Sequence, residues 1–244
     1  MNHHILQVIA LALLPAFGNF AGGLIAEWLE PSKRLLNRAL HAAAGIILAV
    51  IAVEVMPEAL EVAPAWLLAI AFVAGGMAYL GLEGLVDRWL ARRDDSAGKG
   101  AWMVYLAVAT DLLGDGLLIG AGSAVSMKLA LVLAVGQVMA DVPEGFAVIA
   151  NFRAKGVGRA KRLWLAASFA APVVGAAVLS YFLLREQSHV VKMAAVVFVA
   201  GLFILGAMED MLREAHEADD DSRWSAMSLL LGFALFVLVS GGVE

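Results

Sequence analysis

Residues 129–150 read LALVLAVGQVMADVPEGFAVIA, and this stretch decides the fold class. Its apolar residues do not alternate with polar ones, as they would in a strand of a membrane barrel. A run of about 20 apolar residues crosses the hydrocarbon core of a bilayer as an α-helix, which satisfies its own backbone hydrogen bonds. The stretch also contains two acids, Asp141 and Glu144. We therefore expect a transmembrane helix that carries a polar site.

The composition of the whole chain supports this class. Of its 244 residues, 62% are hydrophobic and 16% are charged, and the mean hydropathy is +0.85. Soluble domains are about half apolar and about a quarter charged. The net charge of −5 gives no sign of a nucleic-acid-binding surface. The absence of cysteine excludes disulfides and thiolate metal sites.

Similar apolar blocks predict an all-α membrane protein with eight spans, at residues 5–29, 38–61, 65–88, 101–125, 128–151, 161–184, 191–216 and 223–242. The first block lacks the basic flank and cleavage site of a signal peptide, so we expect it to remain as a span. Fourteen of the 17 basic residues fall in the first, third, fifth and seventh loops. The positive-inside rule then predicts a multi-pass protein of the cytoplasmic (inner) membrane with both termini extracellular or periplasmic.

The first three spans resemble the last three. An offset of 156 residues relates glycines and acids in the two sets: Gly45 to Gly201, Glu54 to Asp210, Glu58 to Glu214 and Gly76 to Gly232. The predicted orientation makes this repeat inverted, which is a common transporter design. We therefore expect one domain over residues 1–244, in a 3+2+3 arrangement. The repeats are residues 1–90 and 160–244, and they flank a central helix pair at 101–152.

The central pair carries four acids inside the membrane. Asp111 and Asp115 are four residues apart and Asp141 and Glu144 are three apart, so each pair lies on one helix face. A carboxylate at mid-membrane costs about 2.5–3.5 kcal/mol on insertion scales, and no basic residue is expected at the same depth. Protonation, water or a bound cation can lower this cost. Several converging carboxylates favour a hard divalent cation.

These residues resemble the ZIP (Zrt/Irt-like) family of divalent metal transporters, in particular its bacterial branch. Residues 140–145, Ala-Asp-Val-Pro-Glu-Gly, are similar to the family's Gln-Asp-x-Pro-Glu-Gly. Residues 111–116, Asp-Leu-Leu-Gly-Asp-Gly, occupy the place of the family's His-Asn-x-Pro-Glu-Gly. Residues 210–216, Asp-Met-Leu-Arg-Glu-Ala-His, are similar to Glu-x-x-Pro-Glu-Ser-His. The match covers nearly the whole chain.

The resemblance implies a transporter and not an enzyme, with a binuclear metal site and elevator-like uptake in which spans one, four, five and six move. The implied metal ligands are Asp111, Asp115, Asp141, Glu144 and Asp210. One site would contain Asp115, Asp141, Glu144 and Asp210. The second, poorer site would contain Asp111 with Asp115 and Glu144 as bridges.

The expected preference for zinc is reduced, because Asp111 stands where the family has histidine. An all-carboxylate set suits Mn²⁺ or Fe²⁺ better than a histidine-bearing set does, while Zn²⁺ and Cd²⁺ still bind carboxylates. The expected cargo is therefore Zn, Mn, Fe, Cd or Co. A proton-coupled transporter of another solute and a non-transporting metal-sensing homologue remain alternatives. The lipid bilayer and metal ions are the expected partners, and a homodimer remains an option.

Acids near the ends of spans two and seven supply candidate access residues. Glu54 and Glu58 lie toward the predicted outer face, and Glu209, Glu214 and His216 lie toward the predicted inner face. We expect Glu54 to help capture the cation from outside, and Glu214 with His216 to receive it inside.

This hypothesis predicts that Glu54→Gln raises the KM for metal uptake, because the substitution removes a charge that attracts the cation. Uptake by reconstituted protein, measured over a range of metal concentrations, would test this. An unchanged KM would contradict an outer capture role for Glu54.

Overall fold

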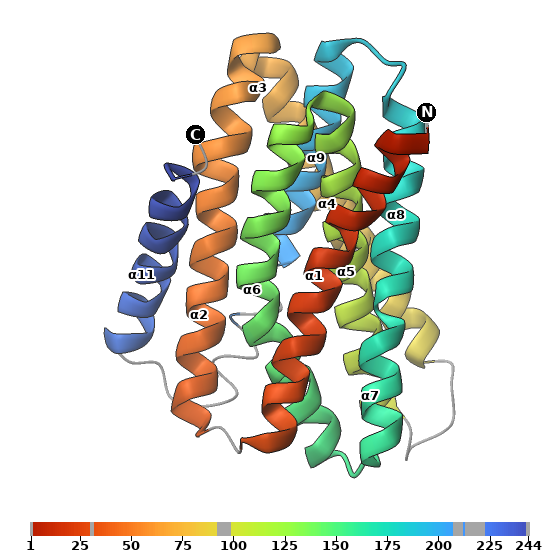
Figure 1. Ribbon diagram of the computed structural model, residues 1–244, viewed down its shortest axis with the longest axis vertical. Helices are drawn as coiled ribbons and strands as arrows, with labels where there is room; N and C mark the ends of the chain where they lie inside the picture. The colour runs from red at the N-terminus through yellow and green to blue at the C-terminus, as the bar shows by residue number, and fades with distance from the viewer. Residues whose placement is uncertain (1, 30–31, 92–98, 207–211, 213–222, 243–244) are drawn as a thin grey trace.

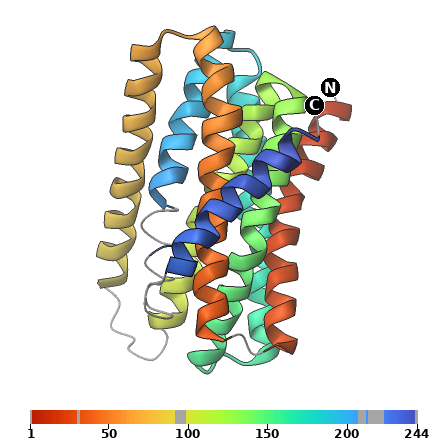
Figure 2. The same ribbon diagram turned by 90° about the vertical axis from the view of Figure 1, so that its left-hand side faces the viewer.

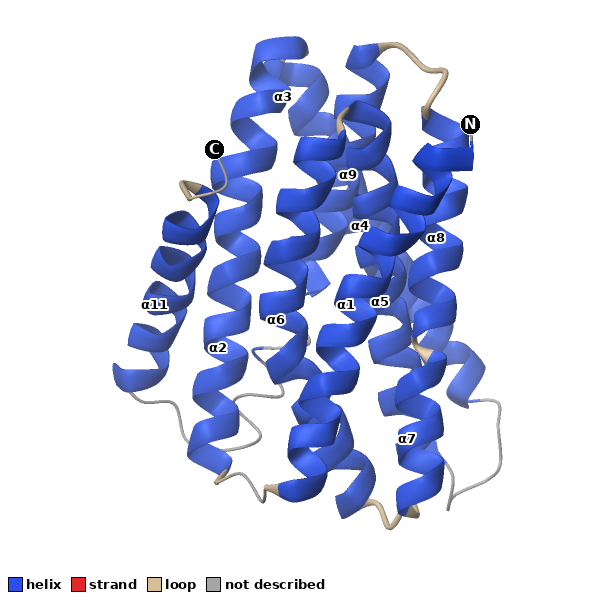
Figure 3. Ribbon diagram, viewed as in Figure 1, coloured by secondary structure: helices blue, strands red, loops and turns tan. Residues whose placement is uncertain are grey.

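The chain folds as a bundle of helices in the computed structural model (Figure 1). The structure describes residues 2–29, 32–91, 99–206, 212 and 223–242. Helices account for the regular structure in these ranges, and none of the residues described there forms a strand (Figure 3). The predicted all-α class is confirmed.

The helical segments are α1 (Asn2–Trp28), α2 (Lys33–Ala49), the π-helical η1 (Val50–Val55), α3 (Met56–Val62), α4 (Ala65–Ala91), α5 (Lys99–Val125), α6 (Met127–Ala154), α7 (Arg159–Ser168), α8 (Ala170–Leu184), α9 (His189–Gly206) and α11 (Arg223–Ser240). The described residues provide eight stretches that are long and apolar enough to cross a membrane. This confirms the predicted number of spans. The sequence did not predict that two of the spans are interrupted.

Proline accounts for both interruptions. Pro57 has no N–H to donate to the carbonyl of Val53 one turn earlier, and the second span widens into η1 immediately before this residue. Pro172 likewise leaves the carbonyl of Ser168 without its helical donor, and the sixth span divides there into α7 and α8. π-Helical segments are frequent at functional sites, and η1 contains Glu54.

Two apolar clusters divide the bundle. One cluster joins α1, α5, α6, α7 and α8 through residues such as Val8, Leu112, Ile149 and Phe169. The other joins α2, η1, α3, α4, α9 and α11 to a second face of α5 and α6. Figure 2 shows α4 at one edge of the bundle and α11 crossing α2 obliquely, and these two spans are the most exposed. Both clusters therefore depend on α5 and α6.

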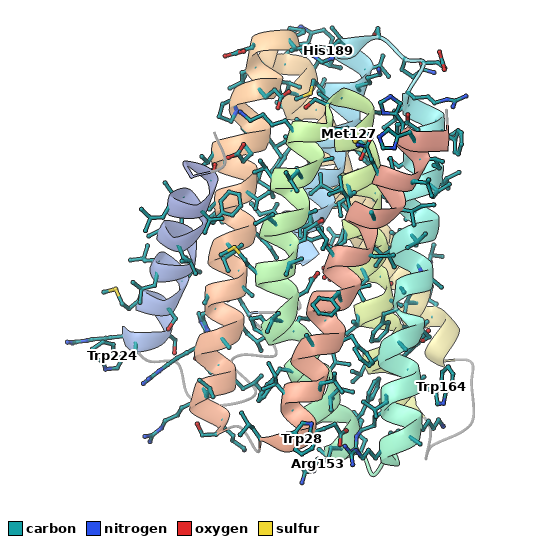
Figure 4. All side chains as sticks on the ribbon, in the orientation of Figure 1. Trp28, Met127, Arg153, Trp164, His189 and Trp224 are labelled. Atoms are coloured by element: carbon teal, nitrogen blue, oxygen red, sulfur yellow. The ribbon has the colours of Figure 1, made fainter. Side chains whose placement is uncertain are left out.

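The two ends of the bundle differ in the residues they carry. Trp28, Arg153 and Trp164 lie at one end, while Met127 and His189 lie at the opposite end (Figure 4). Tryptophan and basic residues are typical of the membrane interface, and basic residues favour the cytoplasmic side. The end that carries Arg153 is the one predicted to be cytoplasmic. The start of α1 and the end of α11 lie toward the other end (Figure 1).

Glycine allows α1 to approach α6 very closely beside the central acids. A Cβ atom on Gly145 would lie 1.8 Å from the carbonyl oxygen of Asn19. A Cβ atom on Gly22 would lie 1.9 Å from the carbonyl oxygen of Val142. Small residues permit such backbone contact between membrane helices. The backbone of α1 is thereby held directly against the segment of α6 that carries Asp141 and Glu144.

We predict that Gly145→Ala lowers the melting temperature of the purified protein, because the added methyl group must push α1 away from α6. Overpacking of this kind costs about 1–3 kcal/mol. Gly81→Ala on α4 is a matched control, since its Cβ atom would have no neighbour within 4 Å. If Gly145→Ala and Gly81→Ala had equal melting temperatures, the close contact between α1 and α6 at Gly145 would be contradicted.

Candidate metal site

The central acids come from α5 and α6, which pack against each other. Asp111 and Asp115 lie one turn apart on α5, and Asp141 and Glu144 lie about one turn apart on α6. One carboxylate oxygen from each of Asp111, Asp141 and Glu144 lies within 4.8 Å of the others. The helix continues through Pro143. Spans four and five therefore bring three of the predicted ligands to one point.

Three of the four acids on α5 and α6 are shielded from the surroundings of the bundle, and Asp111 is half-buried. Asp115 is 0% exposed, Asp141 is 1% exposed and Glu144 is 6% exposed. Among the described residues, neither side-chain oxygen of Asp115 has a hydrogen-bond partner, and Asp141 and Glu144 each have one buried oxygen without a partner. A buried charge without a partner is strongly unfavourable. The site therefore needs protons or a bound cation.

Contacts between the carboxyl groups lead to the same conclusion. One carboxylate oxygen from each of Asp111, Asp141 and Glu144 lies within 4.8 Å of the others. Like charges this close together are unfavourable, so a proton on one of the groups would relieve their repulsion. A divalent cation can replace the proton by accepting oxygen ligands from all three groups. The arrangement can thus hold either protons or a metal ion.

The grouping includes ligands of both sites that the resemblance implied. Asp111 lies beside Asp141 and Glu144, and Glu144 is one of the two residues expected to bridge the sites. Asp115 is one turn away on α5 and is not part of this closest group. Asp210, the remaining expected ligand, lies outside the described residues. The three carboxylates of the closest group are called the carboxylate cluster below.

A recess reaches the cluster at Asp111. It lies between α4, α5 and α9 and is lined by Tyr79, Thr110, Asp111, Leu202, Phe203 and Gly206. Gly206 is the last residue of α9, so the recess lies at the end of this helix that is farther from His189. His189 itself lies at the end of the bundle that also carries Met127 (Figure 4).

Sequence reasoning missed Gln137. This residue is 2% exposed, and its Nε2 donates a hydrogen bond of 3.3 Å to the main-chain carbonyl of Asp115. Its Oε1 is buried and has no hydrogen-bond partner among the described residues. Gln137, Asp141 and Glu144 follow the i, i+4, i+7 spacing of one helix face. That spacing was the available signal.

An ion pair near the Arg153 end was also missed. Arg162 of α7 donates to both carboxylate oxygens of Glu27 of α1, at 2.6 and 2.7 Å, and to the carbonyl of Val157 at 2.5 Å. A bidentate pair of this kind is geometrically specific. It ties α1 to α7. The two residues are 135 positions apart, so no local spacing could have indicated the pair.

Of the candidate access residues, the structure describes Glu54 and Glu58, which lie on other helical segments than the cluster. Glu54, in η1, accepts a hydrogen bond from Ser240 at the end of α11. Glu58 lies on α3 and is half-buried. Glu209, Glu214 and His216 lie outside the described residues, so the inner group remains a prediction.

The chain was compared with known proteins. No protein-family model matches it. It is 26% identical to a protein named zinc transporter ZupT from Escherichia coli O7:K1, in an alignment of 256 positions that covers 96% of this chain and 98% of the relative. ZupT proteins of E. coli O1:K1 and of strain K12 match with the same identity and coverage.

The relatives confirm the resemblance to the ZIP family. The ZIP resemblance extends over almost the full length of both chains, so it includes the spans as well as the site. The relatives are named as transporters, in keeping with the expectation that this chain is not an enzyme. The eight spans and these relatives also support the predicted location in the inner membrane.

The site predicts a pH dependence of metal binding. Carboxylates must lose their protons to bind a cation, so affinity is greatest at neutral pH and falls as the pH is lowered. Equilibrium binding of Mn²⁺ to the purified protein between pH 5 and pH 7.5 would measure this. An affinity that rises as the pH falls would contradict binding through the carboxylates.

Proposed function

We propose that this protein transports divalent metal cations across the cytoplasmic membrane, in the direction of uptake, through the buried carboxylate site between α5 and α6. The observation that carries the proposal is the carboxylate cluster of Asp111, Asp141 and Glu144, with the buried Asp115 beside it. Four acids inside a membrane bundle are costly unless a cation compensates them. The similarity to proteins named zinc transporters supports the same conclusion.

The arrangement of the apolar clusters supports an elevator-type movement. One cluster is confined to α1, α5, α6, α7 and α8, which are the helices of spans one, four, five and six. The pair between Glu27 and Arg162 and the close contact of α1 with α6 hold these helices together. They are suited to move as one body. The carboxylates would then move with α5 and α6 past the surfaces of α2 and α9.

Close contacts in the two outer helix pairs support the inverted repeat and the division at residues 1–90, 101–152 and 160–244. In the α2–α11 pair, a Cβ atom on Gly45 would lie 2.0 Å from the carbonyl oxygen of Leu229. In the α4–α9 pair, a Cβ atom on Gly201 would lie 2.0 Å from the carbonyl oxygen of Phe72. Gly45 and Gly201 are related by the offset of 156 residues. Related positions thus make equivalent contacts, as an inverted repeat requires.

The donor atoms favour a broad choice of metal. The cluster offers carboxylate oxygens and contains no imidazole. Oxygen ligands suit Mn²⁺ and Fe²⁺, and they still accept Zn²⁺, Cd²⁺ and Co²⁺. We therefore propose a weaker preference for zinc than a histidine-bearing site would have. The second candidate is proton-coupled transport of another solute, because three carboxyl groups this close together can also hold protons.

The test is metal uptake into proteoliposomes that contain wild-type protein or the variant Asp141→Asn, supplied in turn with Mn, Fe, Co, Zn and Cd. Asp141→Asn keeps the size of the side chain and removes its charge. Because the variant lacks one charged ligand, we expect it to lower kcat/KM for uptake by about a hundredfold. This factor corresponds to a loss of about 2.7 kcal/mol in the stabilisation of the transition state. Glu186→Gln is the control, because Glu186 is highly exposed and lies far along the chain from the cluster.

The outcomes separate the candidates. Uptake that depends on Asp141 and is unaffected by Glu186→Gln supports metal transport. Wild-type protein that neither binds nor transports any of the five cations at neutral pH would rule it out and favour the second candidate. Strong displacement of Mn²⁺ by equal concentrations of Zn²⁺ and Cd²⁺ would contradict the reduced preference for zinc.

A further inference from the structure

The buried amide of Gln137 lies one helical turn from the carboxylate cluster on α6. Gln137 is one turn before Asp141 on the same face of α6. Its position lies between the two apolar clusters, since neighbouring Leu133 and Ala140 belong to one and Ala134 and Val148 belong to the other. Gln137 therefore continues the polar strip of α6 toward the end of the bundle that carries Met127.

The orientation of this amide is fixed by chemistry. Its Nε2 donates to the main-chain carbonyl of Asp115, and a carbonyl can accept only from a donor. The two ends of the amide therefore cannot be exchanged. Oε1 is left as a buried acceptor with no hydrogen-bond partner among the described residues. A buried oxygen in this state requires an explanation.

The nearest partner on α5 has the same property. Asp115 is completely buried, and both of its carboxylate oxygens lack hydrogen-bond partners within the described ranges. Gln137 touches the main chain of that residue. Two helices thus present unpartnered oxygens at one level, one turn from Asp111 on α5 and one turn from Asp141 on α6. A donor group would satisfy only some of these oxygens, whereas a cation can accept several of them.

We propose that Gln137 is a cation ligand whose side-chain oxygen, with the Asp115 carboxylate, extends the carboxylate cluster by one helical turn toward the Met127 end. This inference rests on the function proposed above. Gln137 adds an oxygen ligand without adding negative charge. It raises the number of oxygen donors available to a cation in the strip, which favours a cation with octahedral oxygen coordination, such as Mn²⁺, over Zn²⁺ with its fourfold coordination.

The experiment measures equilibrium binding of Mn²⁺ and Zn²⁺ to the purified full-length protein at neutral pH. Gln137→Leu removes the oxygen and keeps an apolar side chain of similar volume. We expect the Kd for Mn²⁺ to rise at least about tenfold and the Kd for Zn²⁺ to rise less, so that the ratio of the two changes. Gln137→His adds an imidazole, and we expect it to shift the preference toward Zn²⁺ by about tenfold or more.

Ser123→Ala is the matched control. Ser123 is also buried on α5 with an unpartnered oxygen, two turns beyond Asp115. Its substitution should leave both Kd values unchanged. The melting temperature of each variant is measured in parallel, because a purely structural role for Gln137 would lower it without changing the preference between the two metals.

Each outcome decides the inference. A changed ratio of the Mn²⁺ and Zn²⁺ affinities in Gln137→Leu, with Ser123→Ala unchanged, supports it. Unchanged affinities, or equal losses for both metals, overturn it while metal transport stands. If Gln137→Leu does not fold, the ratio of the Mn²⁺ and Zn²⁺ affinities in Gln137→His decides whether Gln137 is a cation ligand. If wild-type protein binds neither cation, the proposed function fails first and this inference fails with it.

Discussion

Negative charge buried between α5 and α6 is the constraint on which the rest of this molecule depends. Asp111, Asp115, Asp141 and Glu144 come together inside an apolar bundle, where each unpaired carboxylate is costly. The fold does not relieve the cost with water-exposed positions, because three of these residues are almost completely shielded. Only protons or a cation can compensate the charge. The burial that makes these carboxylates unfavourable therefore also makes the site bind protons or cations.

The architecture keeps this polar strip in place. Apolar residues on one side of α5 and α6 pack with α1, α7 and α8, and those on the other side pack with α2, α9 and α11. The acids lie along the line where these two clusters meet. A recess between α4, α5 and α9 is lined by Asp111 at this boundary. The same helices therefore supply the core of the protein and its site.

Two features hold the helices on one side of this boundary together. Glycine lets the backbones of α1 and α6 touch beside the acids, and the ion pair of Glu27 with Arg162 joins α1 to α7 near one membrane interface. Both tie helices that are distant in the sequence. The other side is held differently, with η1 interrupting the second span and placing Glu54 against Ser240. The proposed elevator movement would use the first side as the moving part and the second side as its support.

The sequence alone determined the class, the number of spans and the acids of the central pair, because span length, helix period and the cost of membrane charge are local properties of the chain. It also indicated that Asp141 and Glu144 share a face. Only the tertiary structure decided that Asp111 joins them, that Gln137 reaches Asp115, and that Glu27 pairs with Arg162. Those contacts depend on how far one helix is shifted and turned against another, and that register is set by packing across the whole bundle.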